Sequence, residues 1–226
     1  MNYAEVIKKL KSMRNEKNIA GMARFGITGK EVLGITINEL RKIAKKIGIN
    51  HELALKLYDT GIHEVMMLAS FIEDPAKVTM EQLNSWALRF ESWDHVDMTA
   101  HLFSKTKLAD QIISEWVNRE EELVKRMPFV IICHYAVHRK ELPDKAFRKY
   151  FELIKKHSTD ERNYVKKAVN WALRSIGKRN IKLNREAIKV AEELKKSSDK
   201  TARWIGSHAL RELTSDKVQK RLSKKL

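Results

Sequence analysis

The sequence predicts an all-α fold, an α-solenoid of antiparallel helix pairs stacked along the chain. Two observations lead to this prediction. Only 8 Gly and 3 Pro interrupt the 226 residues, too few for the many turns of an all-β protein. Apolar residues also recur at helical spacing in segments of about 10 to 17 residues with short connections, as stacked helix pairs require. We therefore expect a single helical domain that spans residues 1 to 226.

The N-terminal helices carry clear local signals. Apolar residues from Tyr3 to Met13 fall on one helical stripe, and a second helix is expected from Glu16 to about Arg24. The segment from Phe25 to Lys30 contains two glycines and is expected to be a loop.

A capping box marks the third helix, because Thr36 is followed three residues later by Glu39, and Gly48 ends this helix. The helices that follow are expected at His51 to Asp59, His63 to Ile72, Thr79 to Phe90, Ser92 to about Ser104, Leu108 to Arg119, Leu123 to His138, Pro143 to His157, Arg162 to about Lys178, Arg185 to Lys195, Lys200 to Leu213, and from Asp216 onward.

Two short sequence echoes support the stacking of repeats. Val124-Lys125-Arg126 is echoed by Val165-Lys166-Lys167, and Ala172-Leu173-Arg174 by Ala209-Leu210-Arg211. Both offsets lie near the period of about 40 residues that HEAT and armadillo repeats show. HEAT-like helix pairs with Lys or Arg on one face would form a concave basic surface suited to a duplex.

Charge indicates the class of partner. The 45 Lys and Arg exceed the 29 Asp and Glu, giving a formal net charge of +16, and the basic residues occur in nearly every segment. Such an excess on a folded body attracts polyanions, so nucleic acid is the leading partner. Two alternatives stay open at this point, a basic surface that serves solubility or a hot or salty habitat, and binding to an anionic membrane surface.

Several other classes are disfavoured. No apolar run is long enough for a membrane span, and Met1 to Glu5 leads into a charged segment, so we expect a cytoplasmic protein. The single cysteine, Cys133, lies in an apolar run and offers no disulfide framework. The eight histidines are scattered without ligand spacing. We expect no metal, no cofactor and no membrane partner.

A pair of residues near Ser92 suggests a ligand site. Trp93 and Asp97 are four positions apart at the start of an expected helix, so both side chains point to one face. An indole beside a carboxylate suits a flat cation. In the alternative interpretation, Ser92 or Asp94 only caps the helix, with Trp93 packed in the core and Asp97 solvated.

Two basic clusters also qualify as candidate sites. Lys125 and Arg126 precede Pro128, which a helix tolerates in its first turn or at a kink, so both cations are expected near a helix N-terminus that would bind an anion. The alternative is a solvated basic turn. The second cluster mixes basic, amide and aromatic residues on one helical face, namely Lys167, Asn170, Trp171 and Arg174.

The neighbours of this second cluster extend the expected DNA contacts. Arg162 and Lys166 lie in the same helix, and Arg203 beside Trp204 repeats the theme in the following unit. For Trp204 itself we favour a packing role over contact with a ligand. The complete set of expected DNA-binding residues is Lys125, Arg162, Lys166, Lys167, Asn170, Arg174 and Arg203.

Three segments together resemble a known family, the AlkD-like DNA alkylation repair proteins. These segments are residues 93 to 97, Lys125-Arg126 and residues 166 to 174, in the family's order and spacing, and the resemblance extends from about Met22 to the end of the chain. Members of this family are HEAT-like-repeat DNA glycosylases that remove cationic N3- and N7-alkylated purines. The resemblance implies that Trp93 and Trp171 are pocket aromatics, Asp97 the catalytic carboxylate and Arg126 a contact to the DNA backbone.

The chain departs from the family in three places. The aromatic residue that family members tend to have near the position of Gly21 and Met22 has no counterpart here, the Phe25 to Lys30 loop resembles a short insertion, and His95 is unexpected between the two acids. The resemblance further implies excision from duplex DNA without a deep base-flipping pocket, and we expect a monomer because a solenoid that clasps DNA needs no partner subunit. The alternatives are a non-catalytic binder of damaged, bent or branched DNA, and a helical-repeat scaffold for protein or RNA.

Overall fold

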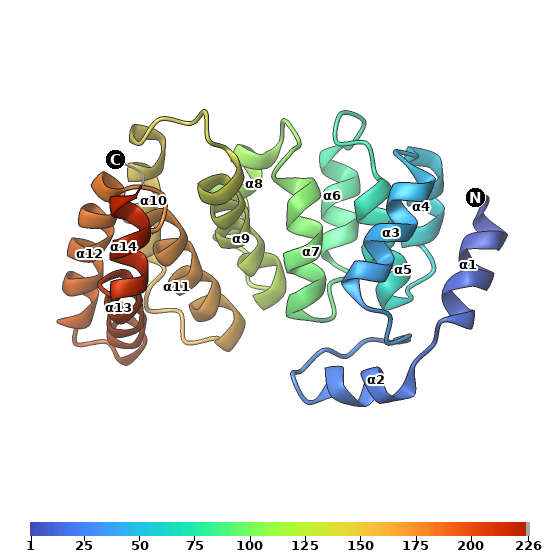
Figure 1. Cartoon of the computed structure of the whole chain (residues 1–226), viewed down its shortest axis with the longest axis horizontal. Coiled ribbons are helices and arrows are strands. Elements are labelled where there is room, and N and C mark those ends of the chain that lie inside the picture. The colour runs from blue at the N-terminus through green and yellow to red at the C-terminus, as the bar shows by residue number, and fades with distance from the viewer. Residues whose placement is uncertain (225–226) are drawn as a thin grey trace. The chain divides into compact units, whose positions relative to one another are not determined.

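The computed structural model describes residues 1–224 and confirms the all-α prediction (Figure 1). Within these residues the regular structure is helical, apart from one isolated parallel bridge between Glu31 and Ile62. The chain divides into two compact units, one from Met1 to Gln111 and one from Ile112 to the C-terminus. No helix within residues 1–224 is both long and apolar enough to cross a membrane.

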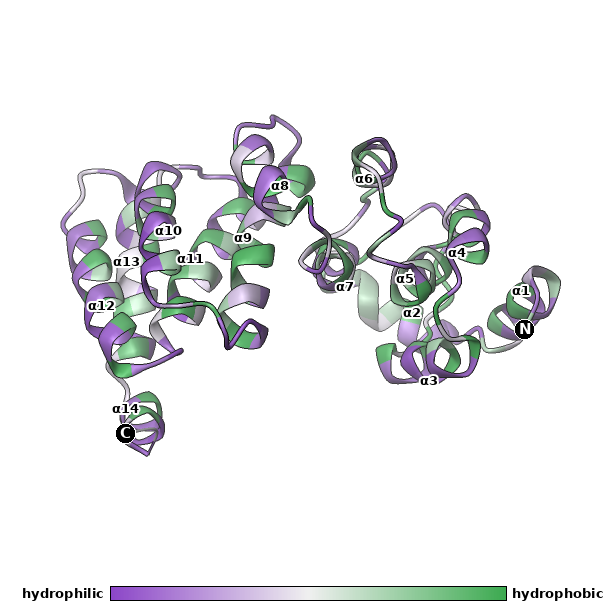
Figure 2. Ribbon diagram, turned by 90° about the horizontal axis from the view of Figure 1, so that it is seen from above, coloured by the Kyte–Doolittle hydropathy of each residue, from purple (hydrophilic) through white to green (hydrophobic). Residues whose placement is uncertain are grey.

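The first unit stacks its helices around α5. Helix α5 contacts α3, α4 and α7, and α1 contacts α4. Figure 2 shows α5 hydrophobic along most of its length, as expected for the central helix of the unit. The helices of this unit are α1 (Tyr3–Ser12), α2 (Glu16–Ala23), α3 (Ile37–Ile47), α4 (His51–Tyr58), α5 (His63–Ile72), α6 (Met80–Ala87) and α7 (Trp93–Phe103), and α8 (Ala109–Trp116) spans the unit boundary.

The second unit repeats one packing step. Helix α9 packs on α11, and α11 packs on α13, while α10 and α12 contact each other and α11. The sequence echoes at 124 and 165 fall on α9 and α11, and those at 172 and 209 fall on α11 and α13. Its helices are α9 (Glu122–His138), α10 (Lys145–Lys156), α11 (Asn163–Gly177), α12 (Ile181–Lys195), α13 (Lys200–Leu213) and α14 (Asp216–Ser223). The two members of each echo therefore lie on helices that contact each other.

Local capping chemistry explains most helix boundaries. The capping box at Thr36 and Glu39 is present, and Gly48 ends α3 with a positive φ of 75°. The start predicted for α12 at Arg185 was wrong by one turn. The Asn180 side chain accepts a hydrogen bond from the Leu183 amide, so α12 begins at Ile181. Pro128 lies inside α9, beyond its first turn, and its missing N–H leaves one helical hydrogen bond unmade.

A buried carboxylate organises the segment that leads into α3. Glu64, only 1% exposed, accepts hydrogen bonds from the backbone amides of Leu33 (2.8 Å), Gly34 (2.6 Å) and Ile35 (3.2 Å). These three bonds offset the loss of hydration that burial imposes on the charge. Gly34 is required here, because its φ is +74° and a Cβ would lie 2.4 Å from the Asn15 carbonyl oxygen.

Removing the Glu64 charge should destabilise the first unit. We expect Glu64→Gln to lower the free energy of unfolding by about 2 kcal/mol or more, since an amide accepts through one oxygen only and its NH₂ faces N–H donors. The exposed Glu52 of α4 provides the control, and Glu52→Gln should change the same quantity by less than about 0.5 kcal/mol. Equal effects in urea denaturation would contradict this role of Glu64.

Candidate nucleic-acid interface

The N-terminus of α7 is not capped in the way the alternative interpretation required. Ser92 occupies the N-cap position but makes no side-chain hydrogen bond to the helix backbone. Its hydroxyl instead donates to Asp94 Oδ1 at 2.6 Å. Ser92 and Asp94 therefore interact with each other, and Asp94 connects α7 to another helix.

That connection is a buried pair between Asp94 and His63. The distance from His63 Nε2 to Asp94 Oδ2 is 3.1 Å, and the His63 side chain is fully buried at the start of α5. Burial disfavours the imidazolium, but the hydrogen bond and charge of Asp94 outweigh it and raise the pKa of His63. Burial likewise opposes the charge on Asp94, but the hydrogen bond and charge of His63, together with the hydrogen bond from Ser92, outweigh it and lower the pKa of that carboxyl. The pair fixes the start of α7 on the start of α5.

Trp93 and Asp97 occupy the same side of α7, and Asp97 is the more deeply buried of the two. Trp93 is half-buried, and its Nε1–H donates to the Phe25 carbonyl oxygen at 3.0 Å. Asp97 is buried, with 8% of its surface exposed. The alternative of a core tryptophan with a solvated aspartate is therefore wrong. Phe25 belongs to the predicted insertion, so this loop positions the indole.

His95, whose role the sequence left open, is a core residue. Its ring is fully buried and lies edge-on to Phe90 and His63, with centroids 5.2 and 5.8 Å away. Its Nε2 lies 3.4 Å from the Tyr58 hydroxyl, which donates to the Trp86 carbonyl. Burial, together with the charge of His63, lowers the pKa of His95 to about 3. His95 is thus neutral at physiological pH and packs between α4, α5 and α7.

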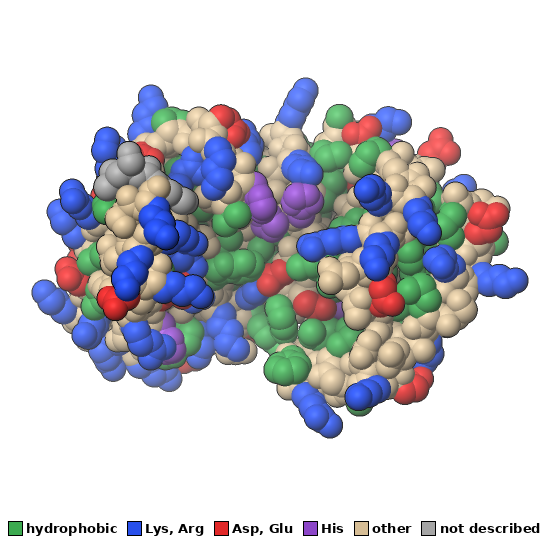
Figure 3. Space-filling model, in the orientation of Figure 1, with side chains coloured by type: hydrophobic (Ala, Val, Ile, Leu, Met, Phe, Trp, Pro, Cys, Tyr) green, Lys and Arg blue, Asp and Glu red, His purple; other side chains and the backbone are tan. Residues whose placement is uncertain are grey.

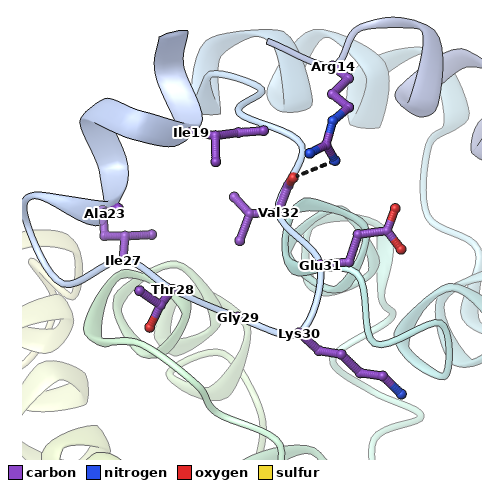
Figure 4. Close-up of a pocket in the computed structure, with 9 residues that line it drawn as sticks. All are labelled: Arg14, Ile19, Ala23, Ile27, Thr28, Gly29, Lys30, Glu31 and Val32. Atoms are coloured by element: carbon purple, nitrogen blue, oxygen red, sulfur yellow. Dashed lines mark hydrogen bonds between the residues drawn. The ribbon is translucent and has the colours of Figure 1, made fainter. Parts of the chain in front are cut away.

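Two pockets adjoin helix α2, and the sequence analysis missed both. One has a volume of about 430 Å³ and is lined by residues of α2, α3, α5 and α7, including Gly21, His63 and Asp94, and by residues of the segment between α2 and α3, including Phe25. The other, of about 300 Å³, lies between α2 and the segment 27–32 (Figure 4). There Arg14 reaches across to donate to the Val32 carbonyl at 3.0 Å.

In the second unit, Lys125 and Arg126 are less available than the sequence suggested. Helix α9 begins at Glu122, so both residues lie near its N-terminus, but protein groups engage both side chains. Lys125 Nζ pairs with Asp160 Oδ2 at 3.0 Å. Arg126 is only 5% exposed, and its Nη1–H donates to the Tyr164 carbonyl at 2.8 Å. These contacts join α9 to the start of α11.

Arg162 is engaged in the same junction. Its guanidinium bonds both carboxylate oxygens of Asp160, at 2.9 and 2.5 Å, and donates to the Glu120 carbonyl. The hydrogen bonds from Arg162 and then Lys125 hold the pKa of Asp160 far below its usual range. The Tyr164 amide in turn donates to Glu122 at 2.7 Å. Arg162 and Lys125 therefore have a structural partner whether or not DNA is present.

The face predicted on α11 is only partly a surface. Lys167 is exposed and Trp171 is half-buried, as a contact surface requires. Asn170, in contrast, is only 4% exposed, and its Oδ1 has no hydrogen-bond partner within the described residues. Arg174 is paired with Glu212, which also binds Lys178. The prediction that Asn170 lies on an accessible DNA-binding face is wrong, because its side chain lies in the core of the unit.

Trp204 packs against two neighbouring side chains. It is half-buried, with the Lys166 ammonium 5.6 Å from its ring centroid and the His208 ring 4.3 Å away. Arg203 is exposed and donates to the carbonyls of Ser197 (3.0 Å) and Ser198 (2.5 Å).

Figure 3 shows Lys and Arg side chains spread over both units on the face in view. Within residues 1–224, no group of three or more His, Cys, Asp or Glu is arranged to hold a metal ion.

Comparison with known proteins gives consistent results. A sequence model of the family described as "DNA alkylation repair enzyme" matches residues 6–213. An uncharacterized protein of Listeria innocua is 25% identical over 201 residues, covering 87% of this chain and 88% of that protein. An uncharacterized protein of Listeria monocytogenes is 27% identical over 149 residues, covering 64% and 65%.

A solved structure has the same fold over nearly the whole length. It is 21% identical, with a TM-score of 0.78, and the match covers 94% of this chain and 95% of the other. That structure is described as "a new family of proteins related to the HEAT-like repeat DNA glycosylases with affinity for branched DNA structures". The prediction of a HEAT-like fold is confirmed.

Two buried neutral histidines should make the fold sensitive to mild acid. Burial lowers the pKa of His95 to about 3, and burial with nearby lysines lowers that of His157 to about 4. In the unfolded chain both protonate near pH 6.5. Below pH 6.5 the unfolded state therefore binds more protons, and stability should fall by up to about 1.4 kcal/mol per pH unit for each residue. Urea denaturation of His95→Leu should show a shallower decline between pH 6.5 and 4.5 than wild type, and an unchanged slope would contradict the assignment.

Proposed function

We propose a function on the basis of the family to which this chain belongs, that of the DNA alkylation repair enzymes. The protein binds duplex DNA and hydrolyses the N-glycosidic bond of cationic alkylated purines of the 3-methyladenine and 7-methylguanine type. The observation that carries the proposal is the start of α7, where a half-buried indole and a buried carboxylate occupy one side of a helix. No metal or cofactor is needed for this chemistry.

The reaction suits a carboxylate that is fixed in place. An alkylated purine already carries a positive charge, so when the C1′–N bond breaks both electrons move to the base and leave it neutral. The sugar develops oxocarbenium character, which the negative charge of Asp97 stabilises. Water then adds its oxygen to C1′ and releases a proton to solvent, with Asp97 orienting the attacking molecule. The products are a free base and an abasic sugar.

Aromatic residues supply recognition of the charged base. Trp93 lies on the same side of α7 as Asp97, and a cation held against an indole face gains up to about 2 kcal/mol when desolvated. The hydrogen bond from Trp93 Nε1 to Phe25 fixes the orientation of the indole, which supports preorganised binding. We assign the same type of contact to Trp171 in the second unit, following its place in the family pattern.

Basic residues of the second unit are assigned to the DNA backbone. Lys167 is exposed on α11, and Lys166 lies over Trp204 close by. Arg126 is held by the Tyr164 carbonyl, and its role in the family pattern is a contact to phosphate beside the lesion. Contacts of this kind set affinity and register without reading sequence.

A second candidate function is binding of branched DNA without excision. The observation in its favour is the solved structure of the same fold, whose description names affinity for branched DNA. The internal ion pairs of Lys125, Arg162 and Arg174 also leave fewer free cations for one continuous phosphate contact. In this case Asp97 would have only a structural role.

Release of free base distinguishes the two functions. We expect the wild-type chain to release 7-methylguanine and 3-methyladenine from methylated duplex DNA in single-turnover reactions followed by chromatography. Duplexes carrying uracil or hypoxanthine provide the control, because these neutral bases lack the charge that makes a good leaving group and should remain attached. Tight binding of methylated and branched DNA without release of any base would reject the glycosylase and favour the binding protein.

A further inference from the structure

We propose that the 430 Å³ pocket beneath α2 receives an unpaired purine base of DNA, one that has already left the base stack at a bulge, branch or damaged pair. The inference rests on the proposed DNA binding and adds a second recognition site to it. Neither Trp93 nor Asp97 is among the residues that line the pocket. The base it holds is therefore distinct from the base whose glycosidic bond is cleaved.

Gly21 is the residue that opens the pocket. It lies inside α2, where glycine lowers helix stability by about 1 kcal/mol relative to alanine. Its backbone is not among the positive-φ glycines, and a Cβ built on it would meet no heavy atom within 4 Å. Neither turn geometry nor close packing therefore requires glycine at this position. What its missing side chain provides is space in the pocket that Gly21 lines.

The lining matches a flat heterocycle with polar edges. Met22, Ile27, Ile35, Ile37 and Met67 form apolar walls, and about 430 Å³ lies within the range typical of small-molecule sites. Two carboxylates line the pocket, Glu64, whose oxygens accept three backbone amides, and Asp94. Ser92 and His63 each use one oxygen of Asp94, which leaves lone pairs on a side chain that is 13% exposed. A purine amino group is a donor suited to such a carboxylate.

Phe25 supplies the stacking surface. It lines the pocket and yet is 73% exposed, the highest value among the large hydrophobic residues described. Exposed apolar side chains of this kind insert between bases in proteins that bind distorted DNA. The backbone carbonyl of Phe25 accepts the Trp93 hydrogen bond, so its position is fixed relative to α7. The exposed phenyl ring can therefore cover a base that enters the pocket.

One lysine lines the pocket, and two further cations bracket the loop that contains Phe25. Lys17 lines the pocket from α2, Arg24 precedes Phe25, and Lys30 ends the same loop, and all three are exposed. Exposed lysine and arginine side chains bind phosphate in a sequence-independent way. A largely apolar pocket with a lysine in its lining fits a base that remains attached to its backbone better than it fits a purely apolar ligand.

The test compares two duplexes that differ only in one bulged 2-aminopurine. Binding is followed by the anisotropy of a terminal dye, and base unstacking by 2-aminopurine emission. We expect wild type to bind the bulged duplex at least about fivefold more tightly than the paired one, with a rise in emission, since stacking on an aromatic side chain contributes about 1–3 kcal/mol per base. Gly21→Leu fills the pocket and should abolish the preference and the rise while the paired duplex binds as before.

Two further variants make the result interpretable. Ala20→Leu adds the same side chain to an exposed neighbouring position of α2 outside the pocket and should behave as wild type. Phe25→Ala removes an exposed side chain without altering the core and should also lose the preference, so the test does not depend on the folding of Gly21→Leu.

The possible outcomes separate this inference from the proposed function. Equal affinity of wild type for both duplexes, or a preference that survives in Gly21→Leu and Phe25→Ala, would overturn the pocket assignment and leave DNA binding intact. Failure to bind either duplex would overturn both. If free 2-aminopurine binds wild type and Gly21→Leu abolishes that binding, the pocket is a site for a free base, and the assignment to a base within DNA fails.

Discussion

The buried pair of Asp94 and His63 is the constraint on which the first unit's candidate site depends. It joins the first turns of α7 and α5 across 3.1 Å, with His63 fully buried and Asp94 13% exposed. Because a helix is rigid over one turn, fixing Asp94 also fixes Trp93 before it and Asp97 after it. Asp94 and Asp97, three residues apart, therefore have different roles. Asp94 holds the helix in place, and we propose that Asp97 carries the chemistry.

Many of the basic residues, like Asp94, make contacts that hold the structure together. A formal net charge of +16 suggests that many Lys and Arg side chains are available to bind phosphate, but several of them are bound to other groups of the protein. Arg179 donates to the carbonyls of Ala136, Arg139, Lys140 and Leu142 and so fixes the turn after α9. Arg162 and Arg174 bind carboxylates of their own unit. Net charge therefore overstates the number of residues available for phosphate, and exposure identifies Lys167 as the best candidate on α11.

The sequence predicted the helices well, because their apolar stripes and caps are local properties. The capping box of Thr36 and the span of α5 from His63 to Ile72 needed no tertiary information. Errors arose where tertiary contacts decide. Asn170 follows the helical spacing of the surface residues, yet its burial depends on neighbouring helices that periodicity does not reveal.

The candidate site was predictable only in part for the same reason. Trp93 and Asp97 could be paired from their spacing alone, but the carbonyl of Phe25 that orients the indole lies 68 residues away in the chain. The pocket beside Gly21 combines residues of α2, α3, α5 and α7. A glycine inside a helix was the single available signal for it, and that signal is ambiguous without the structure.

The most direct test of the separate roles of Asp94 and Asp97 compares the variants Asp94→Asn and Asp97→Asn. Two quantities are measured for each variant, the rate of 7-methylguanine release and the free energy of unfolding. The account predicts that Asp97→Asn remains folded and binds methylated DNA but releases base roughly 100-fold or more slowly. Asp94→Asn should lose unfolding free energy while its folded fraction still releases base. An Asp97→Asn variant that releases base at the wild-type rate would contradict the account.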